Sequence, residues 1–143
     1  MAAFKFYYPI QVRYGDLDPQ WHVNNTKFLA YIEQARLAYM MALGLFDGKS
    51  FHDMGTITAD VHIAYLGQIR LGQDIQVGVR VARLGNKSIR YETQIEDQQS
   101  GQVLARCEIV SVGFDYHQQV SLPIPAHWRE VIAAFEGIPP GPQ

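Results

Sequence analysis

Residue types that could act on a carbonyl carbon gather between Asp16 and Asn25. Asp16, Asp18, His22, Asn24 and Asn25 precede a long apolar run. Asn24 or Asn25 is a good N-cap, so we expect these residues in a turn that leads into a helix. The N–H groups at a helix start suit a developing oxyanion, and a nearby carboxylate could attack a carbonyl or activate water. The same residue types are common in ordinary turns, so chemistry alone makes Asp18 only a candidate.

The elements that would position this segment are indicated by the spacing of apolar residues. Apolar and polar residues alternate over 5–14, which predicts a strand with one buried face. Pro9 places this strand at a sheet edge or a bulge. A helix is expected over about 24–43, ended by Gly44. It is apolar on almost every side, so we expect other structure to enclose most of it.

The rest of the chain predicts strands followed by a short helix. Strands are expected at 57–66, 74–84, 87–96 and 102–114, with a tight hairpin at Gly85 and Asn86 and a helix between Pro125 and Gly137. A mostly apolar helix needs an antiparallel sheet curled round it to be buried. The order of elements therefore predicts an α+β domain with one central helix.

Composition favours one domain in a reducing compartment. The 143 residues are 48% hydrophobic, which suits a single core over 1–137, and the Pro- and Gly-rich end predicts a flexible tail over 138–143. A formal charge of -2 gives no reason to expect nucleic acid or a membrane as partner. The single cysteine, Cys107, cannot form an internal disulfide, which indicates a cytoplasmic location.

Neither a metal site nor a reactive thiol is expected. Asp60 and His62 share one face of a predicted strand and could offer two ligands, but no third ligand is evident. Cys107 lies within a predicted strand, where a thiol normally packs rather than reacts.

Several motifs carry a resemblance to a known family. They are Asp18-Pro19, His22-Val23-Asn24-Asn25, Tyr31, the segment from Glu33 to Arg36, Tyr65-Leu66, and the segments 69–72 and 83–88. In these motifs the chain resembles the hotdog-fold acyl-CoA thioesterases of the 4-hydroxybenzoyl-CoA thioesterase type. The likeness covers roughly four fifths of the chain, and the block from Asp18 to Asn25 is its most specific part.

The resemblance implies a fold, an activity and an assembly. The fold would be a hotdog fold, an antiparallel sheet of about five strands wrapped around one long helix. The activity would be hydrolysis of an acyl-CoA to free acid and CoA thiol, with no metal or redox cofactor. The assembly would be a homodimer, often paired into a homotetramer, with active sites at the subunit interface.

The resemblance also implies roles for individual residues. Asp18 would be the nucleophile or general base, the backbone N–H of Asn25 would face the thioester oxygen, and Asp16 would be structural. Trp21 stands where the family usually has glycine, so a large ring lies near the thioester and affects the acyl groups accepted. Gln68 and Gln73 likewise replace a usual proline and a usual acidic residue.

Further residues are candidates for substrate contact. His22 could hydrogen-bond the substrate or only its own loop. Arg70, Lys87 and Ser88 are suited to the phosphates of CoA. Two other functions stay open at this point. One is hydration of enoyl thioesters by Asp18 and His22 together, and the other is a non-catalytic acyl-thioester binding module in which Trp21 fills the catalytic space.

Overall fold

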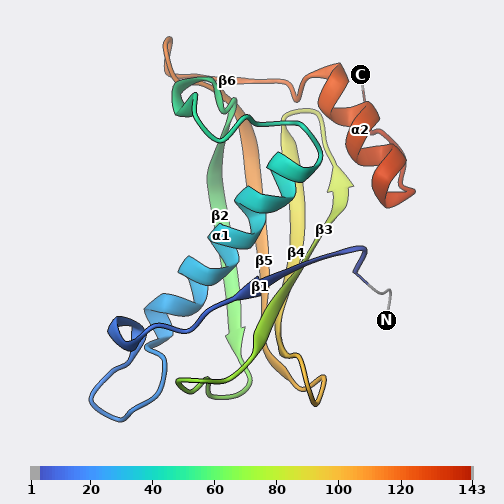
Figure 1. Ribbon diagram of the computed structural model, residues 1–143. Coiled ribbons are helices and arrows are strands. Elements are labelled where there is room, and N and C mark those ends of the chain that lie inside the picture. The colour runs from blue at the N-terminus through green and yellow to red at the C-terminus, as the bar shows by residue number, and fades with distance from the viewer. Residues whose placement is uncertain (1–3, 143) are drawn as a thin grey trace.

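An antiparallel sheet with one long helix across one face forms the framework of the protein (Figure 1). The computed structural model describes residues 4–142. The strands are β1 (Phe6–Ile10), β2 (Thr56–Tyr65), β3 (Ile75–Leu84), β4 (Ser88–Asp97), β5 (Val103–Asp115) and β6 (Val120–Leu122). Their order is β1-β3-β4-β5-β2, and β6 pairs with β5. The expected fold is confirmed, although sequence analysis did not predict the short strand β6.

Helix α1 (Asn25–Ala42) starts and ends where the sequence predicts. The side chain of Asn24 accepts a hydrogen bond from the Thr26 N–H, and Gly44 takes the left-handed φ of 72° just past the end. One face is buried against the sheet, but Ala30 and Gln34 are exposed. The expectation that other structure encloses most of the helix holds on the sheet side, whereas Ala30 and Gln34 are left uncovered within one chain.

Strand β1 forms one edge of the sheet and is shorter than predicted. Its last residue, Ile10, pairs with Ile75, the first residue of β3. Because β3 offers no partner beyond that point, the expected strand over 5–14 stops early. Pro9 lies in this edge strand, where a residue without an N–H is tolerated.

Strand β2 forms the other edge and is exposed along most of its length. Its apolar residues Ile57, Val61 and Tyr65 are 38%, 37% and 45% exposed. β2 pairs with β5 on one side, and no strand pairs with its other side in the part of the chain that the structure describes. An apolar edge of this kind is a ready site for pairing with another chain.

Helix α2 (Ala126–Glu136) is joined to the sheet by a buried arginine. Arg129 is 2% exposed and donates hydrogen bonds to the carbonyl oxygens of Ile124, Gly85, Asn86 and Pro140. One guanidinium thus fastens the start of α2, the β3–β4 hairpin and the C-terminal segment. The flexibility expected for 138–143 stays a prediction, and Gln143 lies outside the described residues.

No helix in the described part of the chain has both the length and the apolarity needed to cross a membrane.

We expect Arg129→Met to lower the free energy of unfolding by about 3 kcal/mol, because it leaves buried carbonyl groups without donors. The melting temperature should fall by roughly 10 °C. Arg90→Met is the matched control. Arg90 is exposed, and its Nη1 lies 3.9 Å from Glu108 Oε2, so the ion pair that is lost contributes little to stability. Thermal unfolding followed by circular dichroism measures both, and equal small shifts would contradict the assigned role.

Candidate functional site

The loop before α1 is a narrow turn held by its own backbone. The Asp18 N–H donates to the His22 carbonyl at 2.9 Å, and the Trp21 N–H donates to the Asp18 carbonyl at 3.0 Å. Leu17 and Val23 form an antiparallel bridge at its base. Asp18 and His22 therefore face each other across a short hairpin.

The carboxylate of Asp18 is only partly used by this turn. Its Oδ1 accepts a hydrogen bond from the Gln20 N–H at 2.9 Å. Its Oδ2 has no hydrogen-bond partner within residues 4–142. One oxygen is thus held in place while the other stays open.

The start of α1 offers an open donor close by in the sequence. Asn24 Oδ1 accepts from the Thr26 N–H at 2.9 Å, which satisfies one of the free amides of the first turn. No described residue accepts a hydrogen bond from the Asn25 N–H. This amide lies at the positive end of the helix dipole, where negative charge is stabilised.

These groups line one hollow of about 240 Å³. Its walls are mostly polar and comprise Asp18, Gln20, His22, Val23, Asn24, Asn25, Phe28, Gly67 and Gln68. Asp18, His22 and the first residue of α1 thus line a single space. Such a set can activate a nucleophile and stabilise an oxyanion.

Trp21 occupies a backbone position that normally requires glycine. Its φ is 65°, in the left-handed region that bulky side chains rarely adopt. This conformation gives a physical reason for the glycine that the family usually has here. The indole is 69% exposed and is not among the residues lining the hollow, although both neighbours, Gln20 and His22, are.

Arg70 lies in the connection that supports the site loop. The Val23 N–H donates to the Ile69 carbonyl at 2.8 Å, which joins the β2–β3 connection to the loop. Gln73 stabilises this connection, since its Oε1 accepts from the Arg70 N–H and its Nε2 donates to Asp97 at 2.8 Å.

Lys87 and Ser88 lie at the opposite end of the same sheet. Ser88 pairs with Val112, which pairs with Ile57, whereas Tyr65 at the far end of β2 donates to the Asn25 carbonyl at 3.3 Å. The eight steps from Ile57 to Tyr65 span about 26 Å at the usual rise of a strand. A single chain therefore does not bring Lys87 and Ser88 to Asp18. Lys87 Nζ instead donates to Ser121 Oγ at 3.2 Å.

Sequence analysis did not single out several residues around the hollow. Gln20 and Phe28 line it, and the ring of Tyr65 packs edge-on against Phe28 with centroids 5.2 Å apart. Gln68 was noted only as a departure from the family. Only the family resemblance at Tyr65-Leu66 could have pointed to this part of the site. Contacts between β2 and the start of α1 form when the chain folds, so spacing along the sequence does not predict them.

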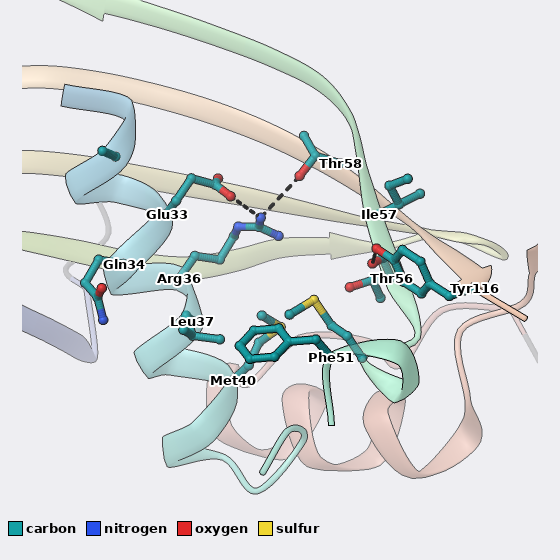
Figure 2. Close-up of a pocket in the computed structure, with 12 residues that line it drawn as sticks. Glu33, Gln34, Arg36, Leu37, Met40, Phe51, Thr56, Ile57, Thr58 and Tyr116 are labelled. Atoms are coloured by element: carbon teal, nitrogen blue, oxygen red, sulfur yellow. Dashed lines mark hydrogen bonds and ion pairs between the residues drawn. The ribbon is translucent and has the colours of Figure 1, made fainter. Parts of the chain in front are cut away.

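A larger groove of about 590 Å³ lies between α1 and the start of β2 (Figure 2). Arg36 lines one wall of the groove and is 8% exposed. Its Nη2 donates to Glu33 Oε2 at 2.6 Å and to Thr58 Oγ1 at 3.2 Å. Leu37, Met40, Phe51, Met54 and Ile57 supply apolar walls. Asp18 does not line this groove.

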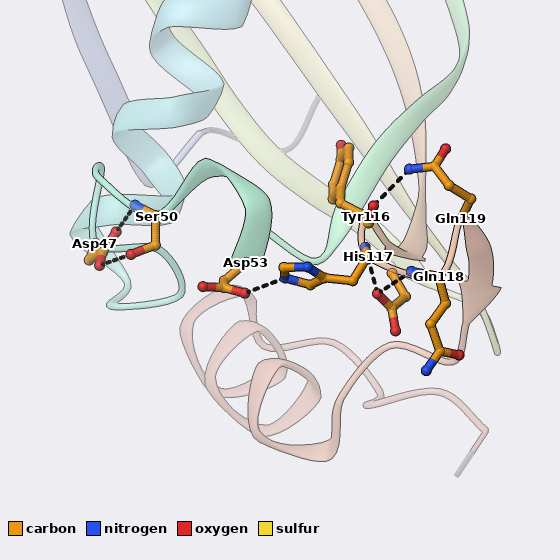
Figure 3. Close-up of polar contacts among 8 residues, drawn as sticks. Asp47, Ser50, Asp53, Tyr116, His117, Gln118 and Gln119 are labelled. Atoms are coloured by element: carbon orange, nitrogen blue, oxygen red, sulfur yellow. Dashed lines mark hydrogen bonds and ion pairs between the residues drawn. The ribbon is translucent and has the colours of Figure 1, made fainter.

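Two loops at the end of this groove are fastened by polar contacts (Figure 3). His117 Nε2 lies 3.3 Å from Asp53 Oδ1, and the Tyr116 hydroxyl donates to the Thr56 carbonyl. Asp47 accepts hydrogen bonds from the backbone and side chain of Ser50. The contacts of His117 and Tyr116 connect the segment at the start of β2 to the β5–β6 turn, and those of Asp47 lie within the segment between α1 and β2.

The residues weighed for metal or thiol chemistry lie elsewhere. Asp60 and His62 are exposed on β2. Within residues 4–142, no three His, Cys, Asp or Glu side chains are grouped so as to hold a metal ion. Burial raises the pKa of the Cys107 thiol to about 11, which keeps it neutral near pH 7.

Comparison with known proteins identifies the family. The family model of the thioesterase-like superfamily matches residues 12–134. The chain belongs to the thioesterase-like superfamily. It is 27% identical over 121 residues to the long-chain acyl-CoA thioesterase FadM of Escherichia coli K12, covering 85% of this chain and 92% of that protein. The predicted acyl-CoA thioesterase activity, and with it an enzyme that hydrolyses thioesters, is confirmed.

Solved structures of the superfamily share the fold. A thioesterase of Thermus thermophilus, crystallised with coenzyme A and Zn, is 34% identical with a TM-score of 0.84, covering 97% of this chain and 100% of that one. A 4-hydroxybenzoyl CoA thioesterase bound to 4-hydroxybenzoyl CoA has a TM-score of 0.79 at 15% identity, covering 89% and 97%. This second likeness concerns the fold alone, and it confirms the hotdog architecture.

Proposed function

We propose that this thioesterase hydrolyses acyl-CoA at the hollow that contains Asp18, with Asp18 as nucleophile or general base and the Asn25 N–H as oxyanion donor. The observation that carries the proposal is that Asp18, whose Oδ2 has no partner among the described residues, and Asn25, whose N–H has none, line one hollow. A base needs a free oxygen, and an oxyanion needs a donor that no protein group already uses.

Either role of Asp18 gives a balanced reaction. As nucleophile, the carboxylate attacks the thioester carbon and the C–S bond breaks, so that CoA departs as thiolate. Water then hydrolyses the resulting anhydride to free acid and the Asp18 carboxylate, which releases the proton that the thiolate takes up. As base, the carboxylate takes a proton from the attacking water and the departing thiolate receives a proton. In both routes the Asn25 N–H donates to the carbonyl oxygen as negative charge develops there.

We further propose that a second copy of the chain completes the site, in a homodimer or a homotetramer built from dimers. Ala30, Gln34, Leu37 and Met41 follow each other at spacings of four, three and four residues along the open side of α1. This is the spacing of a helix–helix seam. The stripe lies beside the exposed edge of β2, so one contact would cover both surfaces.

Pairing across β2 also supports a role for Lys87 and Ser88. A two-fold operation reverses strand direction, so it brings the Ser88 end of one subunit to the Asp18 end of its partner. The partner's apolar groove then lies near the hollow and is suited to the acyl group. We assign the phosphates of CoA to Arg70 of one subunit and to Lys87 and Ser88 of the other.

The proposal includes His22 and Trp21 as substrate contacts. His22 is one of the residues that line the hollow. Trp21 lies between two lining residues in the sequence, and we propose that its exposed indole forms one wall of the acyl site. The single buried cysteine fits the expected cytoplasmic location.

Asp18→Asn should lower thioester hydrolysis by at least ~100-fold, because the amide can neither attack a carbonyl nor accept a proton. Free-thiol release from a panel of acyl-CoAs measures the loss, and circular dichroism shows whether the fold is kept. Glu130→Gln is the control, since it removes an exposed carboxylate on α2. Full turnover by a folded Asp18→Asn variant would refute the assignment.

Val61→Arg should convert the dimer to monomers and abolish most activity, because it places a charge on the apolar edge of β2. Light scattering at micromolar concentration measures the assembly. Val120→Arg changes a valine that is 45% exposed on β6 and should leave assembly and activity unchanged. A fully active monomer of the unaltered protein would contradict the proposal.

Trp21→Gly should widen the range of acyl groups hydrolysed and weaken binding of the preferred substrate, because it removes the indole wall. Glycine tolerates the positive φ of this position, so the melting temperature should change by less than about 3 °C. The measurement is kcat/KM over a chain-length and aryl-CoA series. Tyr14→Ala, at another exposed aromatic, is the control. An unchanged ranking of substrates in Trp21→Gly rules out the wall.

A further inference from the structure

A short hydrogen bond ties the loop that carries Asp18 to the second turn of α1. The Tyr31 hydroxyl donates to Asp16 Oδ2 at 2.6 Å. Tyr31 is 7% exposed and belongs to the face of the helix that packs on the sheet. Because core packing fixes that face of the helix, the Tyr31 hydroxyl keeps a fixed position, and the loop is bonded to it.

Asp16 connects this fixed point to both sides of the loop. Its Oδ2 also accepts from the Arg13 N–H at 3.0 Å, and its carbonyl accepts from the Asn24 N–H at 2.9 Å. One residue thus joins the chain before the loop, the residue that caps α1, and the interior of the helix. Asp16 lies two residues before Asp18 in the sequence. Asn24, to which the Asp16 carbonyl is bonded, lies one residue before Asn25.

The other anchor of the loop does not reach the helix. The Val23 N–H bonds to the Ile69 carbonyl, which fastens the loop only to the β2–β3 connection. Of the hydrogen bonds made by the described residues, the Tyr31–Asp16 bond alone joins the part of the loop before Asp18 to a side chain of α1. Together with the Asn24 N–H bond to the Asp16 carbonyl, it therefore fixes where Asp18 lies relative to the start of α1.

We propose that Asp16 and Tyr31 are positioning residues for hydrolysis: their hydrogen bond holds Asp18 in line with the oxyanion donor without touching the substrate. This inference rests on the catalytic role proposed for Asp18. Misplacement of a reacting group by about 1 Å can cost roughly 100-fold in rate, so a bond that sets this distance affects kcat.

The electrostatics of the pair favour a permanent bond. Burial, followed by the hydrogen bond to Asp16 and its negative charge, raises the pKa of Tyr31 well above the ordinary value. The phenol therefore stays protonated and remains a donor throughout the neutral pH range. The Asp16 carboxylate is already engaged through this bond and is not a second catalytic base.

Tyr31→Phe is the direct test, because it removes only the hydroxyl. We expect kcat to fall about 10- to 30-fold while KM stays within about two-fold. Tyr39→Phe is a closely matched control on the same helix. The Tyr39 hydroxyl is also buried and also donates to a carboxylate at 2.6 Å, that of Glu136, but it lies far from Asp18. Tyr39→Phe should lower the melting temperature and leave kcat unchanged.

Variants of Asp16 test the acceptor. Asp16→Asn keeps an oxygen that can accept from Tyr31 and should retain kcat within about three-fold, whereas Asp16→Ala also loses the bond from the Arg13 N–H and should be at least as slow as Tyr31→Phe. The double variant of Asp16→Ala with Tyr31→Phe should be no slower than Asp16→Ala alone, because the Tyr31–Asp16 bond is already lost in that variant. A double variant whose fold-loss of kcat equals the product of the two single losses would overturn the inference. Equal kcat values for Tyr31→Phe and Tyr39→Phe would overturn it too.

The outcome is separable from that of the proposed function. If Asp18→Asn keeps full turnover, the role of Asp18 fails and the positioning pair fails with it. If Asp18→Asn is inactive but Tyr31→Phe has the kcat of the unaltered protein, only the positioning pair is overturned. Melting curves recorded for every variant separate a loss of rate from a loss of folded protein.

Discussion

The start of α1 is fixed in place by packing and also leaves a backbone N–H without a partner, and the candidate site depends on both features. The helix is held against the sheet by Ile32 and Ala35, which are fully buried, so its starting point cannot shift. Yet the first amides of any helix lack partners within it. Asn24 satisfies the amide of Thr26 and leaves that of Asn25 open. A rigid helix therefore presents one donor to the solvent side of the loop.

Local pattern predicted most of the fold, and non-local contacts account for the rest. The bounds of β2 to β5 lie within one residue of those expected, because side-chain alternation depends on neighbours alone. The early end of β1 depends on where β3 begins, and the Asp16–Tyr31 bond joins residues fifteen apart. The separation of Lys87 from Asp18 depends on strand direction. Spacing in a sequence encodes none of these.

The two edges of the sheet differ in a way that limits how copies of the chain can assemble. β1 carries Pro9, which has no N–H to donate and weakens any added strand. β2 has no proline and exposes apolar side chains. One available edge permits a closed two-fold pair, whereas two available edges would permit an open chain of subunits. The asymmetry thus favours a defined oligomer over aggregation.

The shape of the hollow explains why such a pair would matter for catalysis. A space of about 240 Å³ with mostly polar walls can hold a thioester carbonyl and its neighbours, but an acyl chain there would lie against unsatisfied polar groups. The apolar walls of this chain are in the groove beside Arg36, near the other end of α1. The proposed reaction centre and the apolar groove are thus separated within one chain. An antiparallel partner is the simplest arrangement that brings them together, because it would place the apolar groove of one chain beside the hollow of the other.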